Sequence, residues 1–327
     1  MNAKVKSNRN KTIDFDIESD DAKEYIKRCI TDNDSIKEYS KEYINNKTIN
    51  GDTFIVLEKI EKNIADLMIV DPPYNISKNY HGFKFKDIDN LSYEKYTNLW
   101  VESIIPILKE NAALYVCCDW KSSLIIGNVL DKYFHIQNRI TWQREKGRGA
   151  KNNWKNGMED IWFATLSNKY TFNVDNVKIR RKVIAPYRIE GKPKDWIETE
   201  DGNFRDTCPS NFWDDISIPY WSMAENTAHP TQKPEKLIAK LILASSNEND
   251  FIFDPFLGSG TTSVVAKKLG RNYCGIEQNP TYCAWAEKRI ELAETNKYIQ
   301  GYNDNIFWER NTISIQNKIK NGIISHE

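Results

Sequence analysis

The chain has 327 residues, of which 40% are hydrophobic, and its 46 Lys and Arg residues balance 46 Asp and Glu residues. This balance excludes a strongly basic or acidic protein, so any nucleic-acid surface must come from local clustering of charge. No apolar run approaches the roughly 18 residues that a membrane helix needs, which argues against an integral membrane protein. The polar N-terminus and the absence of CxxC pairs predict a reduced, cytoplasmic protein without a structural metal site.

Strand-like and helix-like runs alternate along most of the chain. The first 47 residues carry apolar side chains at helical spacing and predict a helical extension packed on the main body. From there on the pattern predicts strands at 65–70, 112–117, 136–142, 160–165, 250–253 and 272–276, and helices at 91–108, 122–130, 235–245, 261–269 and 282–295. This alternation predicts an α/β fold with a doubly wound, mostly parallel sheet.

The segment 167–226 interrupts the alternation and predicts an inserted subdomain, because it holds several prolines and shows no clear period. The overlapping stretch 139–196 holds 14 Lys and Arg but 6 Asp and Glu, a local charge of +8 that leaves the rest at −8. This asymmetry favours a DNA-binding surface over an ordinary solvated face. The candidate phosphate contacts are Arg144, Lys146, Arg148, Arg180, Arg181 and Lys182, and the candidate base contacts are Trp154, Tyr187 and Trp196.

The first motif is Asp71-Pro72-Pro73-Tyr74, directly after the predicted strand that ends at Val70. Ligands of open α/β sheets bind at the carboxyl ends of the strands, so this turn lies where a site is expected. The two prolines lack backbone donors, which leaves a carboxylate, carbonyl oxygens and an aromatic ring. Such a set suits an amino group on a flat ring. An ordinary Asp-Pro turn is the competing interpretation.

A glycine-rich segment joins the predicted strand at 250–253 to the next helix, from Asp254 to Thr261 with Gly258 and Gly260. No Gly-Lys-Ser/Thr follows, so it is not a phosphate-binding P-loop, and it is a poor dinucleotide fingerprint. Glu277 ends the following strand, where an acidic residue can accept both ribose hydroxyls of a nucleoside. The pair favours a nucleoside-containing cofactor over a helix cap with a surface glutamate.

A third motif, His229-Pro230-Thr231-Gln232-Lys233-Pro234, precedes the predicted helix at 235–245. Its hydroxyl and ammonium groups at a helix start suit a carboxylate ligand, although helix capping explains them equally well.

The order of the three motifs resembles the permuted, β-type DNA amino-methyltransferases of restriction–modification systems, most of all the adenine-N6 branch. The resemblance covers about residues 48–293. It implies a Rossmann-like methyltransferase sheet of seven strands, one of them antiparallel, with S-adenosylmethionine as the cofactor. It further implies a catalytic domain at 48–166 and 227–295, a target-recognition insertion at 167–226 and a C-terminal tail at 296–327.

The resemblance also assigns roles to single residues. It implies that Asp71, Pro72, Pro73 and Tyr74 are catalytic. It implies that the cofactor is bound by Asp52, Asp71, Thr231, Lys233, Asp254, Phe256, Gly258, Gly260, Thr261 and Glu277.

The expected function is site-specific transfer of a methyl group to adenine N6 in a base that has been flipped out of duplex DNA. Hydrogen bonds from the amino group to Asp71 and to the Pro72 carbonyl would turn the nitrogen lone pair toward the methyl donor, and Tyr74 would stack on the base. The alternatives are cytosine-N4 methylation, which shares this chemistry, and a catalytically silent DNA-binding protein. A cognate endonuclease and a homodimer are possible partners.

Overall fold

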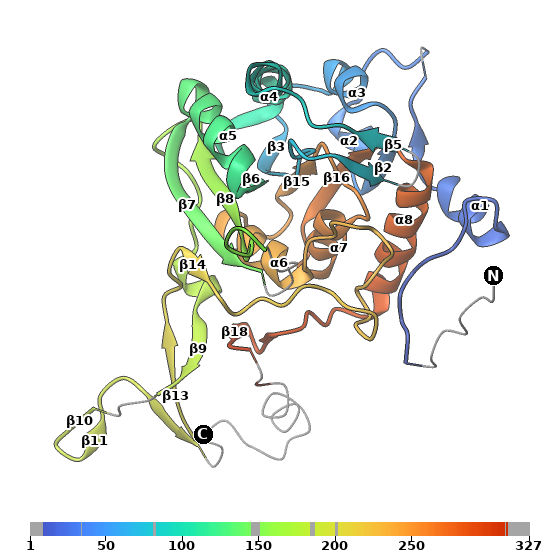
Figure 1. Cartoon of the computed structure of the whole chain (residues 1–327). Coiled ribbons are helices and arrows are strands. Elements are labelled where there is room, and N and C mark those ends of the chain that lie inside the picture. Colours follow the sequence, from blue (N-terminus) through green and yellow to red (C-terminus); the bar gives the residue numbers. More distant parts are fainter. Residues whose placement is uncertain are drawn as a thin grey trace.

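The computed structural model describes residues 9–33, 35–80, 83–144, 151–183, 187–199, 202–310 and 312 (Figure 1). Its α-helices are α1 (Asp20–Ile26), α2 (Lys41–Ile44), α3 (Thr53–Lys59), α4 (Asn90–Ile104), α5 (Trp120–Tyr133), α6 (Glu235–Ser245), α7 (Thr261–Lys268) and α8 (Pro280–Thr295), with 3-10 turns η1 (Ile105–Ile107) and η2 (Val174–Val177). Across the described residues, none of these helices has the length and apolar character needed to span a membrane.

The centre of the molecule is one large sheet. Its strands, in spatial order, are β1 (Ile30–Thr31), β2 (Lys47–Asn50), β16 (Asn272–Glu277), β15 (Phe251–Asp254), β3 (Ala65–Val70), β6 (Leu108–Asp119), β8 (Met158–Thr165), β7 (His135–Gln143) and β14 (Phe212–Trp213). All neighbours pair in parallel except β8, which is antiparallel to both β6 and β7. The predicted mostly parallel α/β sheet is therefore confirmed, but it has nine strands instead of seven, because a two-residue strand extends each edge.

Helices cover both faces of this sheet, as the doubly wound prediction requires (Figure 1). Along β3, Met68 and Val70 pack in one core with residues of α3, α4 and α5, whereas Leu67 and Ile69 pack in the other with α6, α7 and α8. A strand that is buried on both faces is apolar throughout, which explains why this strand was visible in the sequence.

Polar side chains at the start of the helices fix where several of them begin. Each caps a helix by accepting hydrogen bonds from backbone N–H groups of the first turn: Ser19, Ser40, Asp52, Asp89, Asp119 and Asn279. Such caps contribute about 1 kcal/mol each. The Asp52 cap matters most for the site, because it begins α3 directly after β2.

A second, smaller sheet lies beside the β14 edge (Figure 1). Its order is β12 (Ile197–Thr199), β13 (Gly202–Thr207), β9 (Ile179–Lys182), β18 (Ile306–Trp308) and β17 (Tyr302–Asn303). The insertion and the segment predicted as a C-terminal tail therefore share one sheet, through the parallel pairing of β18 with β9. The boundaries of the domains remain predictions.

The N-terminal segment packs on the main body through α1. Ala22 and Tyr25 form a small core with Ala284 of α8, and the Tyr25 hydroxyl donates to Glu291 at 2.9 Å. The segment is less helical than predicted, because it also supplies the edge strand β1, and α2 spans only four residues.

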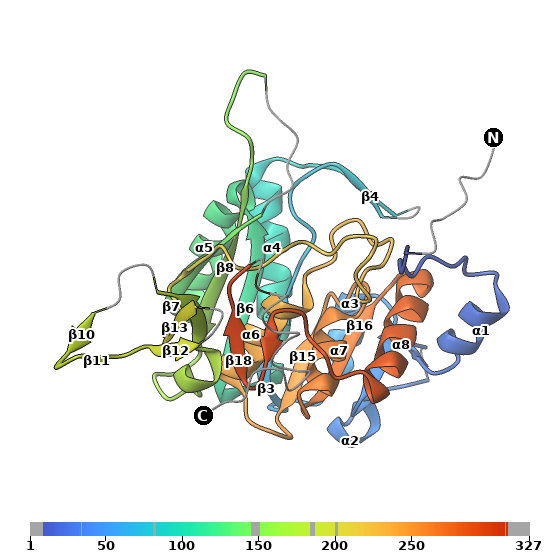
Figure 2. The same cartoon turned by 90° about the horizontal axis from the view of Figure 1, so that it is seen from below.

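Two hairpins project from the large sheet and the insertion: β4 (Lys78–Tyr80) pairs with β5 (Phe83–Phe85), and β10 (Arg188–Ile189) pairs with β11 (Lys192–Pro193). The first hairpin follows the Asp71 turn. Its base is closed by Asn75, whose side chain exchanges two 2.8 Å hydrogen bonds with the backbone of Ile88. Figure 2 shows this hairpin and the segment 151–157 extending from the same side of the molecule.

Candidate active site

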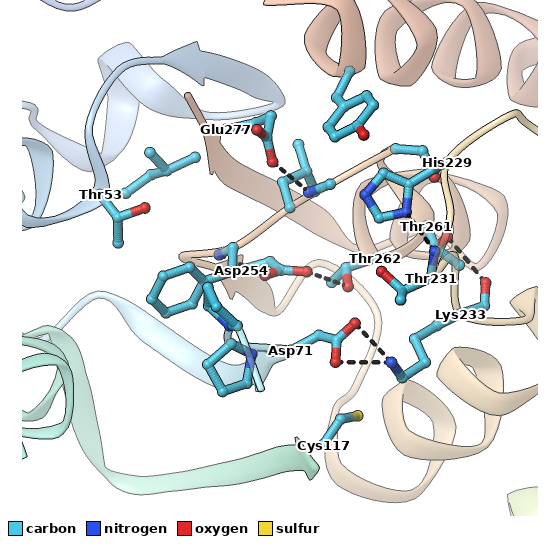
Figure 3. A pocket seen from close by; sticks show the side chains of 18 of the residues that line it. Thr53, Asp71, Cys117, His229, Thr231, Lys233, Asp254, Thr261, Thr262 and Glu277 are labelled. Atoms are coloured by element: carbon cyan, nitrogen blue, oxygen red, sulfur yellow. Dashed lines mark hydrogen bonds and ion pairs between the residues drawn. The ribbon is translucent and has the colours of Figure 1, made fainter. Parts of the chain in front are cut away.

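The polar residues of the three motifs meet at one edge of the large sheet. Asp71 follows β3, Asp254 ends β15 and Glu277 ends β16, and these parallel neighbours place their carboxyl ends side by side. Asp52 lies at the same edge, after β2. The residues surround a cavity of about 380 Å³ (Figure 3). All predicted catalytic and cofactor residues line it except Gly260, namely Asp52, Asp71, Pro72, Pro73, Tyr74, Thr231, Lys233, Asp254, Phe256, Gly258, Thr261 and Glu277.

The Asp71 carboxylate is held by two neighbours. The Lys233 ammonium donates to both of its oxygens, at 2.8 and 2.7 Å, as Figure 3 shows. The Tyr74 hydroxyl donates to Oδ1 at 2.8 Å. The side chain of Asp71 nevertheless remains 24% exposed, so a group in the cavity can reach it. A carboxylate fixed in this way is preorganised as a hydrogen-bond acceptor.

Lys233 has a second acidic neighbour that sequence reasoning missed. Glu159, near the start of β8, lies 3.4 Å from the ammonium and is only 4% exposed. Its other oxygen accepts from the Arg144 guanidinium. Burial by itself would lower the pKa of Lys233, but Asp71 and Glu159 outweigh it and raise that pKa above its ordinary value. Lys233 therefore stays an ammonium.

Tyr74 is also more constrained than its motif indicated. Its hydroxyl lies 3.0 Å from the Lys233 ammonium, which also lies 5.2 Å from the centre of the Tyr74 ring. Burial, together with Asp71 and Glu159, raises the pKa of this phenol well above its usual value. The hydroxyl is therefore neutral and acts as a donor to Asp71.

The loop after β15 is built around Asp254. This carboxyl accepts from the Thr262 hydroxyl at 2.6 Å and from the backbone N–H of Phe256 at 3.0 Å. Burial raises the pKa of Asp254 to about 7. Gly260 has a φ of 85°, and a Cβ there would lie 2.6 Å from the Cβ of Ala286. Only glycine fits this close approach of the loop to α8.

Glu277 organises the other end of the cavity. Its carboxyl accepts from the backbone N–H groups of Gly258 and Asn279, at 2.9 and 2.7 Å. Burial is again the largest cause that raises its pKa, to about 7, and Asp254 contributes to the rise. Hydroxyl donors on a ligand would favour its ionised form, as the predicted contact with a ribose requires.

The third motif joins the cavity to the loop of β15. The backbone carbonyl of Lys233 accepts from the Thr261 hydroxyl at 3.1 Å, and the N–H of Thr231 donates to the His229 ring at 3.3 Å. The Lys233 ammonium contacts Asp71, and its predicted contact with a cofactor carboxylate stays a prediction. The role of Thr231 stays a prediction.

These residues fit a nucleoside-containing cofactor. The cavity volume lies in the range of about 300–1,000 Å³ that is usual for small-molecule sites. The cavity is lined by carboxyl groups that can accept hydrogen bonds from hydroxyl groups, and Phe54, Phe256 and Ile276 form an apolar wall for a flat base. Glu277, Asp254 and Asp52 would hold S-adenosylmethionine, which supplies an electrophilic methyl group when bound.

The predicted DNA contacts are scattered. The Arg144 guanidinium donates to Glu159, and the backbone N–H of Arg144 donates to the Gly157 carbonyl at 2.7 Å. Arg180 forms a bidentate ion pair with Asp206, in which both N–O distances are 2.7 Å. Arg181 forms ion pairs with Glu309 and Asp214. Lys182 is exposed, whereas Lys146 and Arg148 lie outside the described residues. Among the candidate base contacts, Trp154 is 90% exposed, Tyr187 is exposed and Trp196 is buried.

The fold and the cavity define an α/β protein with a cavity of ligand size at the carboxyl edge of a doubly wound sheet. The chain belongs to the DNA methylase family of N6/N4 methyltransferases, whose sequence profile matches residues 65–288. It is therefore a DNA methyltransferase, and the methyl donor of the family is S-adenosylmethionine. The predicted class is confirmed; the permuted arrangement and the adenine branch are not decided by this match.

Several relatives cover most of the chain. The type II methyltransferase M.HpaI of Haemophilus parainfluenzae is 34% identical over 72% of this chain and 71% of its own length. M1.MboII of Moraxella bovis is 32% identical over 77% and 98%. The DNA adenine methyltransferase YhdJ of Escherichia coli is 33% identical over 75% and 82%.

Solved structures share the fold. The PvuII DNA methyltransferase, which is cytosine-N4-specific, superposes with a TM-score of 0.57 at 16% identity and covers 85% of this chain and 93% of its own. The protein TTHA0409 of Thermus thermophilus, in complex with S-adenosyl-L-methionine, gives a TM-score of 0.52 at 17% identity and covers 80% of this chain and 96% of its own.

Proposed function

We propose that the chain methylates the N6 amino group of adenine in duplex DNA, on a base that is flipped into the cavity beside Asp71. One observation carries the proposal: an Asp71 carboxylate, fixed by two donors, stands in a turn of two prolines beside an aromatic ring in the cavity. An exocyclic amino group needs acceptors for its two protons and a stacking partner for its ring. This turn offers both.

The residues of this chain would act by orientation and electrostatics. Asp71 and the Pro72 carbonyl accept the two amino protons, which favours a pyramidal nitrogen whose lone pair points along the line of displacement. Tyr74 stacks on the flipped base. No covalent enzyme intermediate is needed, because the amino nitrogen is itself the nucleophile.

Asp at position 71 favours adenine, because the resemblance that assigns this turn has Asp rather than Ser in its adenine branch. The relative YhdJ, a DNA adenine methyltransferase, supports the same choice. The N4 amino group of cytosine would fit the same acceptors, so it remains the second candidate. A restriction–modification context fits the type II relatives; a partner endonuclease, a homodimer and a cytoplasmic location stay predictions.

The decisive experiment is methylation of unmethylated plasmid DNA with labelled S-adenosylmethionine, followed by digestion to nucleosides and mass analysis. We expect N6-methyldeoxyadenosine. The matched control is Asp71→Ala, which should abolish transfer while leaving DNA affinity largely intact, because its carboxylate acts in the transition state. N4-methyldeoxycytidine as the product would instead establish the second candidate.

A further inference from the structure

The Lys233 ammonium is surrounded by more hydrogen-bond acceptors than it has protons to donate. It contacts both oxygens of Asp71 at 2.8 and 2.7 Å, the Tyr74 hydroxyl at 3.0 Å and Glu159 at 3.4 Å. An ammonium has three protons to donate. Two of the short contacts go to Asp71, whereas Glu159, at 3.4 Å, lies just beyond hydrogen-bond distance.

This arrangement weakens Asp71 as an acceptor for the target amino group as long as Lys233 stays in place. Oδ1 accepts from Lys233 and Tyr74 and Oδ2 accepts from Lys233, so the target amino group must share an oxygen with the ammonium. A carboxylate that remains fully engaged with an ammonium is a poorer acceptor for a neutral amino group, because the ammonium offsets its negative charge and occupies a lone pair on each oxygen. Asp71 becomes a stronger acceptor if the ammonium has another acceptor within reach when the base arrives.

We propose that Glu159 is that acceptor: it is a positioning residue that draws Lys233 away from one oxygen of Asp71 when the target amino group binds there. The inference rests on the proposed function of the site. Glu159 suits the role because Arg144 holds its Oε1, while Oε2 is the oxygen that faces Lys233. Strand pairing of Glu159 with Asp119 and Trp142 on either side keeps its backbone fixed.

The exchange conserves charge pairing in a buried site. Two carboxylates, Asp71 and Glu159, face two cations, Lys233 and Arg144, before and after the shift. A buried charge without a partner is strongly unfavourable, so a single carboxylate could not release the ammonium as readily as a pair can.

The test is Glu159→Gln, which keeps the side-chain shape and the contact with Arg144 but faces Lys233 with a neutral amide. Lys233 then stays on Asp71. We expect kcat to fall roughly 10–100-fold, the range that a hydrogen bond to a charged group is worth. Cofactor affinity and KM for DNA should change by no more than about twofold, the scatter of independent effects.

A double-mutant cycle with Lys233→Met shows whether Glu159 acts through Lys233. Without the ammonium there is nothing to draw away, so adding Glu159→Gln to Lys233→Met should change kcat by no more than about twofold. The same loss in both backgrounds, or an unchanged kcat in Glu159→Gln alone, would overturn the inference. Absence of DNA methylation by the unaltered protein would instead overturn the proposed function.

Asp215→Asn is the matched structural control. Asp215 is a buried carboxylate that pairs with Lys236 and Lys240, at 2.6 and 2.7 Å, away from the cavity. Its removal should lower the melting temperature without changing kcat in the folded protein. A similar fall in kcat for this variant would show that loss of any buried ion pair slows the enzyme, and would count against a specific role of Glu159.

Discussion

Asp71, Asp254 and Glu277 line the same cavity but face different partners. Asp71 faces the Lys233 ammonium, whereas Asp254 and Glu277 accept only from hydroxyl and backbone N–H groups. Neutral donors do not offset the loss of water, so burial raises the pKa of both latter groups to about 7. The site therefore contains two kinds of acid. Asp71 is placed to accept from the amino group, whereas Asp254 and Glu277 have carboxyls that titrate near neutrality.

The raised pKa of Glu277 predicts a pH-dependent cofactor affinity. Below pH 7 the free protein holds this carboxyl protonated, and binding of the ribose hydroxyls as donors must release the proton. Affinity should therefore weaken by up to about tenfold per pH unit as the pH falls from 7 to 5.5, and level off above 8. Calorimetric titration with S-adenosylmethionine across this range measures it.

Two variants isolate the group responsible. Glu277→Gln should bind more weakly and lose most of the pH dependence, and Asp254→Asn should remove only the share that Asp254 contributes. Protons on the cofactor itself titrate equally with all three proteins and cancel in the comparison. An unchanged pH profile in Glu277→Gln would assign the dependence elsewhere.

Tyr74 has two separable parts, a ring and a hydroxyl. Tyr74→Ala should lose about 1–3 kcal/mol of base stabilisation, the worth of stacking on an aromatic ring. Tyr74→Phe keeps the ring but removes the 2.8 Å donor to Asp71, which Lys233 still holds through two contacts. We therefore expect Phe to lose about tenfold in rate, the lower end of the about 1.5–3 kcal/mol that a hydrogen bond to a charged group contributes.

Single-turnover kinetics, cofactor titration and thermal melts on both variants test this division of roles. A Phe variant as inactive as Ala, with unchanged melting, would assign the function to the hydroxyl. Equal loss of stability and of cofactor binding in Ala would indicate a packing residue.

At the scale of elements, the long periodic ones were predictable. Strand β3 and helix α6 have the predicted bounds, and α4 ends before its predicted limit because Pro106 enters a 3-10 turn. The strands of the insertion were not predictable, since segments of two to six residues carry too little period. Glu159 was missed for a different reason, because no motif marks its strand. In the structure β8 pairs with β6, which in turn pairs with β3, and this order places Glu159 near Asp71 and Lys233.

The loop between β15 and α7 depends on glycine at position 260. Gly260→Ala should destabilise the fold by about 3 kcal/mol, because a positive φ costs about 1–2 kcal/mol and forced overpacking adds a similar amount. Gly270 is the matched control, since its φ is also positive, at 74°, but a Cβ there meets nothing within 4 Å. Gly270→Ala should lower the free energy of unfolding only by the about 1–2 kcal/mol that the positive φ costs.

Urea unfolding and cofactor titration distinguish the two glycines. Only Gly260→Ala should also weaken cofactor binding, because its loop carries Asp254 and Gly258. Equal stability losses in the two variants would show that α8 yields to the added methyl group.

At the scale of the whole molecule, the neutral chain concentrates its positive charge in 139–196, and the structure divides that charge into engaged and exposed groups. Arg180 of β9 pairs with Asp206 of β13, and Arg181 pairs with Asp214 and Glu309, which directly follow β14 and β18. By contrast, Lys151 and Lys155 are exposed beside Trp154, in a segment that leaves the large sheet after β7. Because β7 runs parallel to β3, this segment emerges at the edge that holds Asp71.

This division predicts which cations contact phosphates. Lys151→Ala with Lys155→Ala should weaken binding to every DNA sequence alike and reduce the slope of log affinity against log salt by about 2, one counterion for each lost contact. Arg180→Ala should reduce the slope by less than about 1, because Asp206 already occupies the guanidinium, and should lower the melting temperature instead. Fluorescence anisotropy at several salt concentrations measures the slopes. A larger fall for Arg180→Ala than for the lysine pair would mean that the ion pair with Asp206 opens on DNA and that β9, rather than the segment after β7, carries the phosphate contacts.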